Sequence, residues 1–372
     1  MTRSALAGLA ALALLGPIDL RAITIADGFT YGGTSGFAAS SALAQDYGNY
    51  PIFEAVGWFR LDLSDGRSSR STGTLLNNEW VLTAGHSLKP PGEVSSLSFV
   101  LAGATNVADL SSIVMHPLWA APPPPLIDGV GSPSQGWDVA LFRLASPITN
   151  TIAFPRLYTA SNEAGQVGIT LGAGLIGTGT EPWSQQPTNS PVQVFAAMNR
   201  IDRVTAQTNA GLAGGLLATD FDGANEPQNT FGSDYDSSGQ PWLWDEPARI
   251  VTALDPAGTI AGTNSLLDQL VVDGSIVEGS TAPGDSGGPT FIHDGEDWKI
   301  AGITSWGVNP WDYLYGDAAN AGSSGLYGDV SYKTRVSQVA PWIVSVVPEP
   351  STYALLVMAG AGALWWAGRR RG

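Results

Sequence analysis

The sequence predicts an all-β protein whose short antiparallel strands form a sandwich or a barrel. The 372 residues include 46 glycines and 25 prolines, a proportion that suits many strands joined by tight turns. Apolar runs of strand length recur along the chain, and helix signals are scarce. Hydrophobic residues make up 44% of the chain and charged residues 13%, so we expect a globular protein rather than a disordered one.

The strand signals begin after residues 23–50, a Gly-, Ser- and Ala-rich stretch that we interpret as a pro-segment or a flexible arm. Runs with the length and composition of strands then follow in this order: Ala55–Leu63, Ser71–Leu76, Glu79–His86, Ser96–Gly103, Asp138–Ala145, Val167–Leu175, Trp298–Trp306 and Gly325–Tyr332. Two long interruptions are expected to be loops, the proline-rich Ala121–Gly136 and the acidic Ala218–Gln240. One short helix is expected over Gln338–Val347, with Pro341 in its first turn.

The N-terminus has the layout of a secretory signal peptide. Arg3 precedes the apolar run Ala5–Gly16, which is the order of a charged and a hydrophobic region. We expect residues 1–22 to be this signal, with cleavage after Ala22 or after Ala44 left open.

The C-terminus carries a second targeting signal. Val347–Thr352, with the letters VPEPST, precedes an apolar run of marginal membrane-spanning length, Tyr353–Gly368, and then three arginines. Residues 347–372 thereby resemble the PEP-CTERM sorting signal of Gram-negative bacteria. The resemblance implies export to the cell envelope or beyond, and removal of the transmembrane segment by an exosortase-type enzyme. A permanent membrane anchor is the alternative.

The net charge argues against one class of partner, and the cysteine content excludes disulfide bonds. The net charge of −16 disfavours binding to nucleic acid, because phosphate contacts require clustered basic side chains. The absence of cysteine excludes disulfides, so the exported protein must be stabilised by packing alone. We expect a monomer that needs no cofactor and no metal.

Three residues each have an ordinary structural explanation when taken singly, but together they indicate a chemical function. His86 ends an apolar strand, Asp138 directly precedes another, and Ser286 lies in a loop of glycines and prolines. In this order, and within the motifs TAGH, DVAL and GDSGGP, they resemble the chymotrypsin/trypsin family of serine peptidases over roughly residues 52–346. The resemblance implies two packed six-stranded antiparallel β-barrels with a short C-terminal helix, in a protease domain over residues 51–346.

The resemblance also implies a mechanism that suits these residue types. A serine hydroxyl is a weak nucleophile at neutral pH, so His86 would take its proton while Asp138 orients the imidazole. The backbone N–H groups of Gly284 and Ser286 would form the oxyanion hole. The function expected is an exported serine endopeptidase that forms an acyl-Ser286 intermediate. The alternatives are an inactive protease-like binding module at the cell surface or in the exopolysaccharide matrix, and a tail-anchored structural protein of that matrix.

The substrate pocket and the switching of the enzyme are less well defined. By the resemblance, Ser280 forms the pocket floor, and the walls include Ser305, Trp306 and Gly307. A neutral floor argues against Arg or Lys in the pocket and favours an apolar or aromatic side chain. Asp285 would pair either with a freed amino terminus, for which Ile23 is a candidate, or with another group.

Four further polar residues have weaker functional signals. Asp220 and Asp222 could bind calcium, but a solvated turn is favoured because their spacing matches no calcium-binding loop. His116 and His293 are expected to be structural or surface residues.

Overall fold

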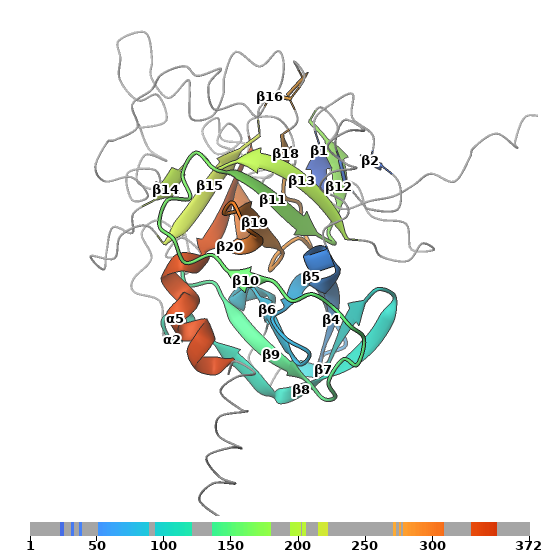
Figure 1. Cartoon of the computed structure of the whole chain (residues 1–372). Helices are drawn as coiled ribbons and strands as arrows, with labels where there is room; N and C mark the ends of the chain where they lie inside the picture. The colour runs from blue at the N-terminus through green and yellow to red at the C-terminus, as the bar shows by residue number, and fades with distance from the viewer. Residues whose placement is uncertain are drawn as a thin grey trace, which may run out of the picture.

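A computed structural model describes residues 23–25, 31–32, 37–38, 51–88, 94–120, 136–179, 194–201, 203–205, 215–221, 271–272, 275–276, 278–308 and 329–347. These residues form a closed six-stranded barrel and a larger sheet that curls into a half-barrel beside it, with one helix along their common side (Figure 1). The all-β prediction is confirmed. The predicted signal peptide and the predicted apolar span Tyr353–Gly368 lie outside the described residues.

The barrel is formed by the first half of the chain. Its strands are neighbours in the order β4-β5-β6-β9-β8-β7 and close on themselves by the pairing of β4 with β7. Alternating burial along β4 places Phe59 and Leu61 inside the barrel. The strands are β4 (Val56–Leu63), β5 (Ser68–Leu75), β6 (Trp80–Thr83), β7 (Val94–Leu101), β8 (Ala104–Met115) and β9 (Ala140–Leu144).

The larger sheet has ten strands, of which eight follow the barrel in the chain and two, β2 and β3, precede it. Nine follow the order β14-β15-β21-β20-β19-β11-β13-β3-β2, and β10 pairs with β20. They are β2 (Tyr31–Gly32), β3 (Phe37–Ala38), β10 (Arg156–Leu157), β11 (Val167–Gly172), β13 (Phe195–Arg200), β14 (Arg203–Thr205), β15 (Leu216–Asp220), β19 (Pro289–His293), β20 (Trp298–Val308) and β21 (Val330–Arg335).

Short elements complete the described fold. Three strands form a small separate sheet in the order β12-β1-β18, and two more pair as a hairpin. These are β1 (Ile23–Ile25), β12 (Ile176–Thr178), β18 (Gly279–Ser280), β16 (Val271–Val272) and β17 (Ser275–Ile276). The helical elements are η1 (Pro51–Ala55), η2 (Gly85–Ser87), α2 (Pro117–Ala120) and α5 (Val336–Val346).

Two details of the sequence prediction were wrong. The expected loop Ala218–Gln240 begins inside β15, because Ala218 is buried and pairs with Tyr332 of β21. The C-terminal helix begins at Val336, two residues before the predicted start, and Pro341 therefore lies in the helix interior rather than in the first turn. Since proline has no N–H, the helix lacks one backbone hydrogen bond there.

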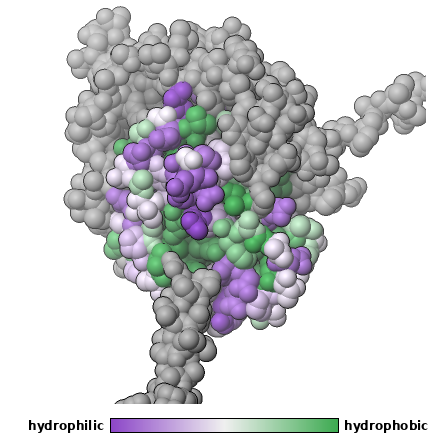
Figure 2. Space-filling view, viewed as in Figure 1, coloured by the Kyte–Doolittle hydropathy of each residue, from purple (hydrophilic) through white to green (hydrophobic). Residues whose placement is uncertain are grey.

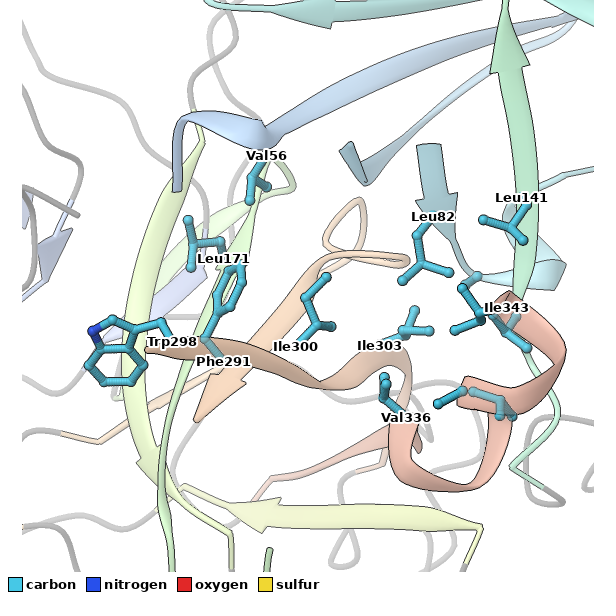
Figure 3. Packing of buried hydrophobic residues seen from close by; sticks show 14 of the residues in the cluster. Val56, Leu82, Leu141, Leu171, Phe291, Trp298, Ile300, Ile303, Val336 and Ile343 are labelled. Carbon is cyan, nitrogen blue, oxygen red and sulfur yellow. The ribbon is translucent and has the colours of Figure 1, made fainter. Parts of the chain in front are cut away.

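The barrel and the curled sheet share one hydrophobic core. Val56, Leu82 and Leu141 from the barrel face Leu171, Phe291, Ile300 and Ile303 from the sheet (Figure 3). Val336 and Ile343 of α5 pack against the same cluster, so the helix contacts both halves. Burial of this apolar surface fixes how the two halves sit against each other, and hence how residues at their edges meet.

The exposed surface of the described residues is mixed. Hydrophilic and hydrophobic residues alternate over the face seen in Figure 2, and the large exposed hydrophobic residues are Val107, Leu118 and Val344, on three different elements. Among the helices of the described part, none is long and apolar enough to cross a membrane.

Candidate active site

The three side chains predicted to act together meet where the barrel faces the curled sheet. His86 Nδ1 lies 2.6 Å from Asp138 Oδ2, and His86 Nε2 lies 2.9 Å from Ser286 Oγ. Because an ionised carboxylate only accepts hydrogen bonds, Nδ1 carries the ring proton and Nε2 can accept from the serine hydroxyl. The side chain of Asp138 is completely buried, whereas 34% of the His86 side chain is exposed. The arrangement therefore has one solvent-facing side, next to Ser286.

Strand ends position all three residues. His86 lies in η2, directly after β6; Asp138 lies just before β9; and Ser286 lies in the loop before β19. The glycine at position 85 also has a local reason, because a Cβ there would lie 2.5 Å from Nε1 of the Trp119 side chain.

Asp138 is held by more groups than the sequence indicated. Its Oδ1 accepts the backbone N–H of His86 at 2.7 Å, and its Oδ2 accepts the hydroxyl of Ser305 at 2.5 Å. The pairing of β20 with β21 shifts register between Thr304 and Trp306, so Ser305 is the extra residue of a β-bulge. A bulge turns one side chain out of the strand's alternation, and here that side chain donates to Asp138. Sequence reasoning placed Ser305 in the substrate pocket and missed this contact.

The two N–H groups predicted for the oxyanion hole belong to peptides whose carbonyls are already bound. Pro283 O accepts from Leu175 N at 2.9 Å, and Asp285 O accepts from Gly288 N at 2.7 Å. In a trans peptide the N–H points opposite to the C=O, so these bonds orient the N–H groups of Gly284 and Ser286. Within the described part of the chain, neither N–H donates to a protein acceptor.

Positive backbone angles at two glycines shape this loop. The φ angle of Gly284 is 100° and that of Gly287 is 82°, a region that side chains with a Cβ rarely adopt. At Gly287 space is limiting as well, because a Cβ would lie 2.0 Å from Thr83 Oγ1.

Asp285 belongs to the same loop, and its side chain is fully buried. Its Oδ1 accepts from Gly174 N at 2.8 Å and its Oδ2 from Ala282 N at 2.7 Å. Burial raises the pKa of Asp285 to about 7, although both backbone hydrogen bonds favour the ionised form. A nearby positive charge would stabilise the ionised form of this buried carboxyl group.

The strand that follows the predicted signal peptide lies close to this carboxyl group. In β1, Ile23 N donates to Leu175 O at 3.0 Å, next to the Gly174 N–H that binds Asp285. Ile23 is fully buried and has a φ of 74°, which is unfavourable for a β-branched residue. The next residue, Thr24, pairs with Ser280. The beginning of the predicted arm is thus part of the folded structure around Asp285.

The predicted pocket residues lie on neighbouring strands. The Ser280 hydroxyl is 2.9 Å from that of Ser331, which in turn is 2.8 Å from the hydroxyl of Thr281. Lys333 Nζ donates to Ser331 O at 3.3 Å and to Thr219 Oγ1 at 2.6 Å. All of these side chains are buried.

The predicted pocket walls follow along β20. The Trp306 ring stacks on Tyr332 with centroids 4.1 Å apart, and Gly307 pairs with Ser331. Among the described residues, the Ser280 hydroxyl is therefore bonded to another hydroxyl group, that of Ser331.

The other two histidines lie apart from this hydrogen-bond network. His116 is buried, stacked on Trp137 with ring centroids 4.8 Å apart, and burial lowers its pKa. His293 is exposed and contacts the edge of Trp298. The described residues contain no group of three His, Cys, Asp or Glu side chains that could hold a metal ion. Asp222 lies outside the description, so the choice between a calcium site and a solvated turn stays a prediction.

The closed barrel beside the curled sheet, with a His–Asp–Ser arrangement between them, agrees with the chymotrypsin-like fold expected from the motifs. Residues 56–222 match the family model Trypsin, which confirms the resemblance expected from the motifs. The matched segment contains His86 and Asp138, and Ser286 lies beyond it. Residues 346–371 match the PEP-CTERM protein-sorting motif, so the chain carries the predicted export signal.

Two solved structures are also similar to this chain. One is titled as an HL collagenase, at 16% identity and a TM-score of 0.44, covering 79% of this chain and 94% of the other. The second is neuropsin, described as a serine protease expressed in the limbic system of mouse brain. It shares 17% identity with this chain at a TM-score of 0.44, over 80% of this chain and 96% of its own.

Proposed function

We propose that this protein is an exported serine endopeptidase that hydrolyses peptide bonds through an acyl-Ser286 intermediate. The observation that carries the proposal is the continuous chain of hydrogen bonds from Asp138 through His86 to Ser286, with distances of 2.6 and 2.9 Å. His86 takes the hydroxyl proton as Ser286 attacks, and later gives it to the leaving amine. Asp138 keeps the imidazole oriented and stabilises its positive charge.

The negative oxygen of the tetrahedral intermediate would bind the N–H groups of Gly284 and Ser286. Their orientation by bound carbonyls and the lack of a protein acceptor within the described residues support this role. Removal of one such donor costs about 3–4 kcal/mol of transition-state stabilisation in enzymes of this kind.

For the primary pocket we propose a neutral floor at Ser280, with walls at Ser305, Trp306 and Gly307. The hydroxyl groups of Thr281 and Ser331 around Ser280 support a preference against Arg and Lys side chains. We keep the expectation of an apolar or aromatic side chain, which a panel of peptide amides differing only at this residue will test. Fastest cleavage after Arg or Lys would contradict it.

Cleavage before Ile23 is the activation step that we favour. It would place a new ammonium group beside the turn that binds Asp285, and burial of Ile23 supports that position. The C-terminal signal would then be processed by an exosortase-type enzyme, releasing the protease to the cell envelope or the medium. Mass spectrometry of the mature protein tests both ends: we expect Ile23 first and no residues 353–372.

A fluorophosphonate probe tests the central proposal, because it labels only a serine that a neighbouring base activates. We expect labelling of the processed wild-type protein and of Ser345→Ala, which changes an exposed serine, and no labelling of Ser286→Ala. A wild-type protein that stays unlabelled after processing at Ile23 would favour the binding module.

A further inference from the structure

Thr72 is a barrel residue that contacts the loop of the proposed nucleophile. It lies in β5 and is completely buried. Its backbone N–H donates to Ser286 O at 2.9 Å, and its Oγ1 donates to Gly284 O at 2.9 Å. One residue of the barrel therefore binds two carbonyl groups of a loop that belongs to the curled sheet.

The hydroxyl of Thr72 acts both as a hydrogen-bond donor and as a hydrogen-bond acceptor. While it donates to Gly284 O, it accepts the N–H of Ala173 at 2.9 Å. Ala173 is fully buried and directly precedes Gly174, whose N–H binds Asp285. A single hydroxyl thus joins β5, the nucleophile loop and the turn after β11.

The carbonyl of Thr72 connects the same residue to the strand of the proposed base. Thr83 Oγ1 donates to Thr72 O at 2.9 Å, and Thr83 is the last residue of β6, three positions before His86. Hydrogen bonds that converge on Thr72 therefore link the strand before His86 to the loop that contains Ser286.

The Gly284 peptide needs such an anchor more than others in the loop. With a φ of 100° and no Cβ, Gly284 can rotate at low energetic cost, and rotation would turn its N–H away. The bond from Thr72 Oγ1 holds the carbonyl on one side of Gly284, and the bond from Leu175 to Pro283 O holds the peptide on the other side. Without the hydroxyl, the Gly284–Asp285 peptide loses its carbonyl partner and, among the described residues, is held only by the bond from Asp285 N to Ala282 O at 3.0 Å.

We infer that the Thr72 hydroxyl is a positioning group for the oxyanion site, acting across the two halves through the carbonyl of Gly284. It touches no reacting atom. This inference rests on the proposed peptidase function and names a residue that the motifs did not indicate. A sequence reader would take Thr72 for an ordinary strand residue, because its partners lie 101 and 212 positions away in the chain.

Thr72→Val tests the inference, because valine keeps the shape and removes the hydroxyl. Since removing an oxyanion donor reduces kcat by about 100- to 1,000-fold, we expect a partly misaligned donor to lower kcat by roughly 10- to 100-fold. KM for the same peptide should stay within about twofold, since ground-state binding does not use the oxyanion site. Affinity for a peptidyl trifluoromethyl ketone, whose adduct places an oxyanion there, should fall in parallel with kcat/KM.

The same strand offers a matched control. The hydroxyl of Thr74 is equally buried and has no hydrogen-bond partner among the described residues, so Thr74→Val removes a hydroxyl from β5 without removing a bond. Its kcat should equal that of wild type. Thr72→Ser retains the hydroxyl and should restore kcat to within a few-fold. If Thr72→Val does not fold, Thr72→Cys takes its place, with a smaller loss expected because a thiol is a weak donor.

The outcomes separate the two proposals. A wild-type protein with no turnover and no probe labelling overturns the peptidase function and this inference with it. An active wild type with unchanged kcat in Thr72→Val overturns only the role of Thr72. Equal losses in Thr72→Val and Thr72→Ser, or a rise in KM with unchanged kcat, would also overturn it, since both would reflect packing or substrate binding.

Discussion

His86 Nε2 and Ser286 Oγ lie 2.9 Å apart although 200 positions separate the two residues in the chain. One belongs to the closed barrel and the other to the loop before β19 of the curled sheet, so their contact exists only while the two halves are packed together. The shared core around Leu82, Ile303 and Ile343 provides that packing. Substitutions in this core should therefore affect activity as well as stability.

Replacing Asp138 should reduce activity more than replacing Ser305, which donates a hydrogen bond to it. Asp138→Asn should lower kcat/KM by about 10⁴-fold, because the amide favours the wrong imidazole tautomer. Ser305→Ala removes one of the donors to Asp138 and leaves the His86 bonds intact, so we expect a loss of roughly 10-fold. Hydrolysis of a peptide ester measures both. An equal loss in the two variants would mean that Ser305 does more than support Asp138.

A Cβ at Gly287 should disrupt the nucleophile loop. Gly287→Ala would bring the new methyl within 2.4 Å of Thr72 O, and the φ angle of 82° adds backbone strain. Gly66→Ala is the matched control, since its φ is 86° and nothing lies within 4 Å of the added atom. Urea unfolding should show a loss of about 1 kcal/mol for Gly66→Ala and a larger one for Gly287→Ala. Only Gly287→Ala should lose probe labelling, and retained labelling would mean that the loop can shift.

Asp285 should make the uncut chain less stable as the pH rises. The folded state holds the Asp285 proton up to about pH 7, whereas the unfolded chain releases it near the ordinary value of 3.8. Between these values the folded state binds more protons, so the free energy of unfolding contributed by Asp285 falls by about 1.4 kcal/mol per pH unit. Urea titrations at pH 5 and pH 7 should show this fall in uncut Ser286→Ala protein, and not when Asp285→Asn is added.

Cutting before Ile23 should remove that fall. An ammonium group beside Asp285 favours the carboxylate, and the folded-state pKa of Asp285 should drop to its ordinary value of 3.8 or lower. In the cut protein, the difference in unfolding free energy between the chain with Asp285 and its Asp285→Asn variant should then no longer change as the pH rises. An identical pH dependence in cut and uncut protein would mean that Ile23 is not the partner of Asp285.

The buried ion pair beside α5 should support stability at neutral pH. Arg335 donates to both carboxylate oxygens of Glu163 at 2.9 and 2.7 Å, and Ser337 Oγ donates at 2.6 Å. Burial alone would raise the pKa of Glu163, but these hydrogen bonds outweigh it and lower the pKa below 4.5. The stabilisation is therefore complete above about pH 4.5 and is lost as the pH falls through the lowered value.

Glu163→Gln tests this pair at pH 7. Because it removes the negative charge that pairs with the buried Arg335, we expect a loss of about 3 kcal/mol in the free energy of unfolding. Asp65→Asn is the control, since it breaks an exposed pair with Arg67 that should contribute nothing measurable. A loss in Glu163→Gln no larger than in the control would show that the buried pair is not stabilising.

The sequence by itself predicted the candidate triad and five of the six barrel strands, all except β8, for which no strand-length apolar run was identified. Runs such as Ala55–Leu63 indicate strands because alternate side chains of a strand point to the same face. Burial of that face therefore requires apolar residues at every second position. His86, Asp138 and Ser286 stand in short motifs whose residues are consecutive, so they could be read locally. The same holds for the C-terminal sorting motif, whose three parts lie within 26 residues.

Tertiary structure alone decided which groups hold these residues in place. The bulge that turns Ser305 toward Asp138, the docking of Ile23 beside the Asp285 turn, and the bonds from Thr72 to Gly284 and Ala173 all join segments that are far apart in the chain. A hydroxyl in a strand has no local pattern that reveals a partner 212 positions away. Such hydrogen bonds form only after the barrel and the curled sheet have buried their shared core, because that packing brings the partners together.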